Sequence, residues 1–271
     1  MKKHPLIIVA SLFALVSCAT SESTDSKSAF ISQSTGEENE TINDNEERAP
    51  ADLEESEYSN FATYYFNKLN NFKTYKAITV GETKASIVTQ KINVTFIKND
   101  YSYFHNESTS TFYNSRHDCY YHENQAIYKN KGDKEYTVST IDDYLTKYGT
   151  YPLDTAIEGL AVNDEAIISI TKEKNNDLFK YKFEFDIEKA TKKVKIQMKE
   201  FGKLDKEPTF SKINVVITVK GDFTPVSIDL SSKYKIKKGV NTNCSQKYTV
   251  TFSQFDEAIN VPGLDEVKNL F

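Results

Sequence analysis

The sequence predicts an α+β protein, an antiparallel sheet with helices on one face. Three observations support this prediction: apolar residues at helical spacing early in the folded part, several stretches in which apolar and polar residues alternate, and two helical segments between those stretches. The 271 residues are 38% hydrophobic and 13% aromatic, which is enough apolar material for a sizeable core. This composition excludes collagen, a coiled-coil rod and a fully disordered chain.

The helices are predicted from the 3.6-residue period and from capping residues. Ser139 to Asp142 is typical of a helix start, Asp186 caps the next helix, and Gly149 and Gly202 are expected to end these two helices. The predicted helical ranges are 58–69, 139–149 and 186–202, with a further helical turn near 152–160.

The strands are predicted from apolar residues at every second position, which is typical of antiparallel strands with one wet face. The clearest alternating ranges are 92–96, 179–185, 213–219, 226–236 and 248–252. No repeat and no linker divides residues 58–271, so we expect one domain over that range.

The N-terminus reads as an export signal. Lys2 and Lys3 precede an apolar stretch over 6–16, which ends in Leu15-Val16-Ser17-Cys18. This ending resembles the lipobox of bacterial lipoproteins. The resemblance implies that the Cys18 thiol receives a diacylglyceryl group, that residues 1–17 are cleaved, and that acyl chains such as palmitate anchor the protein to the extracytoplasmic face of the cell membrane. The alternative is an ordinary secretory signal whose cysteine is incidental.

Residues 18–57 are predicted to form an acidic, disordered tether. From residue 19 onward they hold 12 acidic residues against Lys27 and Arg48, a net charge of −10, and show almost no apolar period. The whole chain carries −5, of which Lys2 and Lys3 contribute +2, so residues 58–271 carry +3. Such a small positive charge spread over so long a range indicates no nucleic-acid binding.

The order of elements in residues 55–271 is similar to that of the LolA-like lipoprotein-carrier half-barrel, which also serves lipid-binding lipoproteins of the LppX and LprG type. The stretch 193–210, with Gly202 and Pro208-Thr-Phe210, also looks like uncharacterised lipoproteins of low-GC bacteria. The resemblance implies that the sheet is curved and that an apolar cavity between the sheet and the helices holds acyl chains.

No motif for a catalytic nucleophile, a nucleotide or a cofactor is present, so we expect neither an enzyme nor a cofactor. The nearest approach to a metal-ligand cluster is formed by His117, Cys119 and His122, which His105 could complete across a hairpin. Cys119 shares a strand face with His117 and not with His122, which leaves too few ligands for a metal. We therefore predict no metal site and interpret these histidines as surface residues.

Two cysteines remain once Cys18 carries lipid. An even pair in an exported protein is consistent with a Cys119–Cys244 disulfide, and also with two separate buried thiols. The disulfide requires a strongly curved sheet, because it would join an early strand to the last one.

The aromatic residues Phe179, Tyr181, Phe183 and Phe185 fall on one strand face, where they either line an apolar cavity or belong to the packed core.

These two interpretations correspond to two functional hypotheses. The first is a lipid-anchored, monomeric, non-catalytic lipoprotein that binds or carries an apolar, lipid-like ligand. The second is a structural or partner-binding surface lipoprotein with a filled core and no ligand.

Overall fold

The computed structural model describes residues 48–111, 114–148 and 164–271. The expected signal peptide, Cys18, most of the expected tether and the helical turn expected near 152–160 lie outside these ranges.

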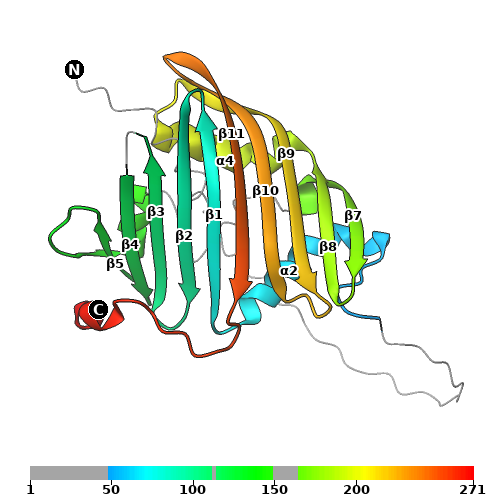
Figure 1. The fold of residues 1–271 in the computed structure, drawn as a ribbon, viewed down its shortest axis with the longest axis horizontal. Coiled ribbons are helices and arrows are strands. Elements are labelled where there is room, and N and C mark those ends of the chain that lie inside the picture. The colour runs from blue at the N-terminus through cyan, green and yellow to red at the C-terminus, as the bar shows by residue number, and fades with distance from the viewer. Residues whose placement is uncertain (1–47, 112–113, 149–163) are drawn as a thin grey trace, which may run out of the picture.

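A single open sheet of 11 strands dominates the described structure; helices α2 and α4 cover one of its faces, and the short C-terminal helix lies on the other (Figure 1). The strands are β1 (Tyr75–Ala85), β2 (Val88–Lys98), β3 (Ser102–Ser110), β4 (Asn114–His122), β5 (Gln125–Asn130), β6 (Thr137–Thr140), β7 (Ile167–Asn175), β8 (Leu178–Phe185), β9 (Lys206–Lys220), β10 (Pro225–Lys238) and β11 (Val240–Ser253). The helices are η2 (Glu55–Asn60), α2 (Phe61–Asn71), α3 (Ile141–Tyr148), η3 (Asp164–Ala166), α4 (Ile187–Gly202), α5 (Leu264–Val267) and η4 (Lys268–Leu270).

The strand order is β6-β5-β4-β3-β2-β1-β11-β10-β9-β8-β7, and every neighbouring pair is antiparallel. The first and last strands therefore lie side by side in the middle, where β1 pairs with β11 from Lys76–Ser253 to Ala85–Cys244. This pairing joins two runs of hairpins into one curved sheet with β6 and β7 at its edges. The predicted α+β class with a curved half-barrel sheet is confirmed.

The α4 helix begins and ends as the sequence predicts. The Asp186 side chain accepts hydrogen bonds from the backbone N–H groups of Glu188 and Lys189, at 3.0 and 3.2 Å. Gly202 is the last helical residue. The left-handed cap is Lys203, with φ 48°, whose N–H bonds back to the carbonyl of Glu200.

The sheet carries a hydrophobic core on each face. The large core lies on the helix-covered face, hereafter the inner face, where α2 packs through Phe61, Tyr65 and Leu69. A small second core lies on the outer face, where the C-terminal residues Val261 and Val267 cover part of β2–β5. Within the described residues, no helix is both long and apolar enough to cross a bilayer.

The predicted Cys119–Cys244 disulfide is wrong, since both cysteines are free and buried. The strand register shows which residue of β11 lies opposite Cys119. From Cys119 of β4, the paired residues on β3, β2, β1 and β11 are Phe104, Phe96, Ala77 and Phe252. Cys244 therefore lies four strands away and eight residues further along β11, which is roughly 19 Å across and 26 Å along the sheet. A disulfide needs Cα atoms within about 7 Å.

Candidate functional site

The predicted aromatic row lies on the inner face of β8 and is packed against protein. Phe179, Tyr181, Phe183 and Phe185 are each at most 7% exposed. The Phe61 ring of α2 lies 4.8 Å from the Tyr181 ring and 4.9 Å from the Phe183 ring, measured between centroids. At this end of the inner face, the row is therefore part of a filled core.

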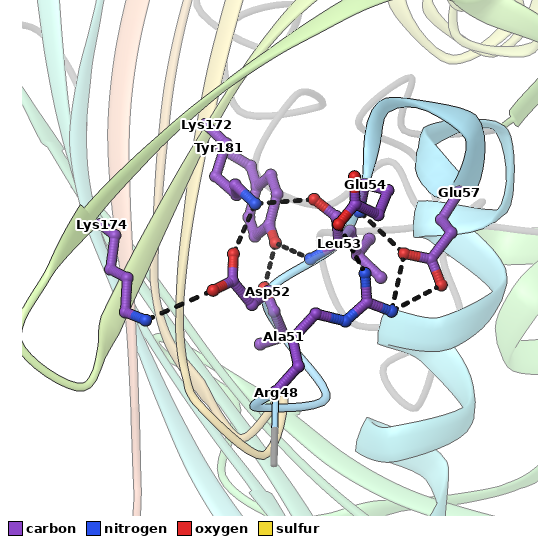
Figure 2. Close-up of polar contacts among 9 residues, drawn as sticks. All are labelled: Arg48, Ala51, Asp52, Leu53, Glu54, Glu57, Lys172, Lys174 and Tyr181. Carbon is purple, nitrogen blue, oxygen red and sulfur yellow. Dashed lines mark hydrogen bonds and ion pairs between the residues drawn. The ribbon is translucent and has the colours of Figure 1, made fainter. Parts of the chain in front are cut away.

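A segment of the expected tether completes this core (Figure 2). The Tyr181 hydroxyl donates to the carbonyl of Ala51 and accepts from the N–H of Leu53 at 3.4 Å. The Asp52 carboxylate forms ion pairs with the ammonium groups of Lys172 and Lys174, with N–O distances of 2.5 and 3.3 Å. The hydrogen bond from Lys172 holds the pKa of Asp52 below its usual value. Ala51 and Leu53 are buried. Their docking corrects the expected boundary at residue 57, because residues 48–57 are folded against the body.

Arg48 fixes the same segment from its N-terminal end. Its guanidinium lies 3.2 Å from a carboxylate oxygen of Glu54 and 3.0 Å from one of Glu57, as Figure 2 shows. The Glu57 carboxylate also accepts the backbone N–H of Glu54 at 2.7 Å. These bonds shape the turn that leads into η2 and α2.

A row of polar side chains crosses the central strands of the inner face, close to the ends of these strands where β1 turns into β2. Gln90 of β2 pairs with Thr83 of β1, Thr83 with Gln246 of β11, and Gln246 with Ser232 of β10. All four residues are at most 3% exposed. We call Gln90, Thr83, Gln246 and Ser232 the amide row.

The members of the amide row differ in their hydrogen bonds. The Thr83 hydroxyl bonds to the Tyr248 hydroxyl at 2.5 Å. Tyr248 can lie in this position because its ring rests on Gly81, where a Cβ would overlap the ring. In contrast, within the part of the chain that the structure describes, the carboxamide nitrogen and oxygen of Gln90 and of Gln246 have no hydrogen-bond partner, and neither does the Ser232 hydroxyl.

Such groups are rare in folded proteins, where the large majority of buried polar side-chain atoms are paired. Each unpaired buried group destabilises a fold by about 1–3 kcal/mol. The two glutamines lie on either side of Thr83, about 10 Å apart, and each offers an N–H donor and a carbonyl acceptor on the same face. The amide row is therefore suited to a neutral guest that both donates and accepts hydrogen bonds, or that presents an ester or amide carbonyl.

His117 is on the inner face and not on the surface as predicted. Its Nδ1 lies 3.0 Å from the Asn130 side-chain oxygen, and its Nε2 lies 2.8 Å from the Tyr144 hydroxyl. Burial lowers the pKa of His117, and the bond to Asn130 offsets part of this shift. The imidazole and the ring of Tyr144 fill the inner face between β4 and α3.

Asp118 lies on the outer face, where its carboxylate contacts three side chains. It accepts from Tyr103 at 2.8 Å and from the Arg116 Nε at 2.8 Å, and it lies 2.7 Å from His105 Nδ1. Burial raises the pKa of Asp118, but the bonds from His105, Arg116 and Tyr103 outweigh it and hold the pKa far below its usual value. The carboxylate thus holds one strand pair together beside a pocket of about 410 Å³.

The four predicted metal-ligand candidates do not converge. His117 and Cys119 face inward, His105 bonds to Asp118 on the outer face, and His122 Nδ1 lies 3.2 Å from the carbonyl of Asp100. Among the described residues, no three His, Cys, Asp or Glu side chains are grouped as a metal ion would require.

The sequence analysis missed the amide row. A signal was present, because Gln90 and Gln246 stand at positions where their strands otherwise place apolar residues, in phase with Ile92 and with Tyr248. Alternation assigns each glutamine to the inner face, but only the strand order brings the two together.

No protein-family model matches the chain, and no curated protein matches it. Several solved structures are similar to the chain in fold. The lipoprotein LppX of Mycobacterium tuberculosis is 10% identical, with a TM-score of 0.40, over 77% of this chain and 100% of that one. A LolA-superfamily protein of Nitrosomonas europaea is 8% identical, with a TM-score of 0.26, over 73% and 90%. A DUF1329-family protein of Desulfovibrio piger is 8% identical, with a TM-score of 0.28, over 78% and 95%.

These structural neighbours include the two groups that the sequence resembles, LppX and the LolA superfamily. At such TM-scores the likeness is one of outline. The half-barrel assignment for this chain therefore rests on its own strand order and register.

Proposed function

We propose that this protein is a non-catalytic binder or carrier of an apolar, lipid-like ligand, held between the inner face of the sheet and the helices that cover it. The observation that carries the proposal is the amide row, in which Gln90 and Gln246 are buried and neither carboxamide is paired with any described residue. A ligand with an ester, amide or hydroxyl group would satisfy these atoms.

The surroundings of the amide row fit an amphiphilic guest. The next residues along the same face are Ile92, Tyr248 and Leu230 on one side and Ala85 and Cys244 on the other, all buried. A polar group at the amide row would thus have apolar surface on both sides, where acyl chains bury favourably at about 25 cal/mol per Å².

The test is to purify the full chain under mild conditions, extract it with organic solvent and identify bound lipid by mass spectrometry. We expect about one lipid per protein in the natural sequence, and a marked loss in the double variant Gln90→Leu/Gln246→Leu. Gln125→Leu is the matched control, because Gln125 is exposed on β5. A folded natural protein that yields no lipid would overturn the proposal.

A second candidate function is a structural or partner-binding lipoprotein with a filled core. The packing of the aromatic row against Phe61 and Leu53 favours it, since that part of the interior leaves no room for a guest. The extraction experiment separates the two, because a filled core yields no lipid from either the natural protein or the variants.

We also propose that Cys18 anchors the chain to the extracytoplasmic face of the cell membrane as a monomer. The support is the lipobox ending Leu15-Val16-Ser17-Cys18 behind a charged and apolar leader. Cys18→Ala should prevent lipidation and release the protein or leave uncleaved precursor. Unchanged membrane attachment together with an unchanged acylated mass in this variant would contradict the anchor.

A further inference from the structure

A groove of about 840 Å³ lies at the junction of β1, β9, β10 and β11. Four lysines line it, Lys84, Lys206, Lys233 and Lys235, together with hydroxyl and amide side chains such as Ser245 and Asn243. No carboxylate is among its lining residues.

The strand register explains why the lysines gather. Ser245 of β11 pairs with Lys84 on one side and with Lys233 on the other, so two lysines flank it about 10 Å apart. Lys235 follows two residues later on the same face of β10, about 7 Å from Lys233. Lys84, Lys233 and Lys235 are exposed, whereas Tyr234 between the last two is buried on the inner face.

Two irregularities between β9 and β10 shape the groove. The register shifts between Lys233 and Tyr234, and again between Lys235 and Lys237. The second shift places Lys206 opposite Lys237. Bulges of this kind bend a strand and redirect its side chains, and they are common beside functional sites.

The charge in the groove is largely uncompensated. Lys84 forms an ion pair with Glu82 at 2.8 Å. In the described part of the chain, Lys206, Lys233 and Lys235 have no carboxylate within 4.0 Å. Like charges held at these separations repel one another, and a concave surface of one sign concentrates the opposite ion.

We propose that this groove is a second binding site, which takes a phosphate-bearing anion. Lys206, Lys233 and Lys235 would neutralise a ligand with two or more negative charges, and Asn243 and Ser245 would donate to its remaining oxygens. The groove lies on the face opposite the amide row, so the proposal does not depend on the lipid-binding function. A soluble phosphate chain and a phospholipid headgroup share this chemistry.

The experiment measures binding of inorganic tripolyphosphate to the full chain by calorimetry, with Cys18→Ala to keep the protein off membranes. We expect Lys233→Gln/Lys235→Gln to weaken binding by about tenfold or more, because charge-assisted bonds are roughly twice as strong as neutral ones. Lys180→Gln/Lys182→Gln is the matched control, since it removes the same charge from the exposed face of β8 and should leave the affinity unchanged.

A second arm uses phosphatidylcholine vesicles with and without phosphatidylglycerol. Binding to tripolyphosphate alone assigns the groove to soluble phosphates, and groove-dependent binding to the anionic vesicles assigns it to headgroups. Equal losses in the groove and control variants, or no binding of the natural sequence to either probe, would overturn the proposal. Unfolding midpoints confirm that the variants, which change only exposed side chains, remain folded.

Discussion

The aromatic row on β8 and the amide row across β2, β1, β11 and β10 occupy the same face of the same sheet. The first is complete, since Phe61 packs on its rings and the backbone of Ala51 and Leu53 satisfies the Tyr181 hydroxyl. The second leaves the buried carboxamides of Gln90 and Gln246 without a hydrogen-bond partner among the described residues. The difference shows that one end of the interior stabilises the fold, whereas unpaired amides at the amide row lower its stability, as the proposed binding of a guest would require.

The largest expected effect lies at the aromatic row. Phe61 is fully buried and contacts rings from β8, so Phe61→Ala should lower the free energy of unfolding by about 3–5 kcal/mol. Denaturant unfolding measures this change. Asn67→Ala, on the exposed side of the same helix, is the control and should change stability by no more than about 0.5 kcal/mol. Similar losses in both variants would refute the comparison.

The next largest effect is on the free energy of unfolding, which two substitutions in the amide row should change in opposite directions. In protein freed of lipid, Gln246→Leu should raise the free energy of unfolding by about 1 kcal/mol, because it removes an unpaired buried amide. Thr83→Val should lower it by about 1–3 kcal/mol, because it leaves the Tyr248 hydroxyl unpaired. Urea titration measures both, and a clear loss of stability in Gln246→Leu would show that the amide is satisfied in the unliganded protein.

A smaller effect depends on pH. Because burial lowers the pKa of His117 beneath its ordinary value of 6.5, the unfolded chain binds more protons just under that pH than the folded chain does. Stability should therefore fall as the pH drops below 6.5 and should be insensitive to this group above it. His117→Gln should flatten the decline, and His122→Gln, at the rim of the same strand, should not. A decline of equal slope in all three proteins would contradict the buried, neutral imidazole.

The smallest effect is expected where the tether meets the body. The ion pairs of Asp52 with Lys172 and Lys174 are partly exposed, so Asp52→Asn should lower the free energy of unfolding by less than about 1 kcal/mol. Limited proteolysis should nevertheless cut the variant sooner within residues 48–57. Unchanged cleavage would show that the hydrogen bonds to Tyr181 hold this segment without the ion pairs.

Much of the fold followed from local patterns. The period of two identified β2 and the strands from β8 to β11, and the Asp186 cap located α4, because these signals depend only on residues a few positions apart. Strands β3 and β4 lacked a clean alternation, since Tyr103 and Tyr120 on the outer face are covered by C-terminal residues and are therefore apolar as well. The boundary between tether and body was predicted at residue 57, which is too late in the chain. The buried residues Ala51 and Leu53 form no apolar pattern, because the residues around them are polar.

The sequence by itself predicts a leader over residues 1–17. It also determined the α+β class and the face of the sheet on which each strand residue lies, because side-chain direction repeats every two residues along a strand. Only the tertiary structure decided which residues are lateral neighbours. The pairing of β1 with β11 aligns Gln90, Thr83 and Gln246, places Lys84 and Lys233 on either side of Ser245, and keeps Cys119 far from Cys244. Lateral neighbours come from strands distant in the sequence, and their register is fixed by packing over the whole sheet, which no local pattern records.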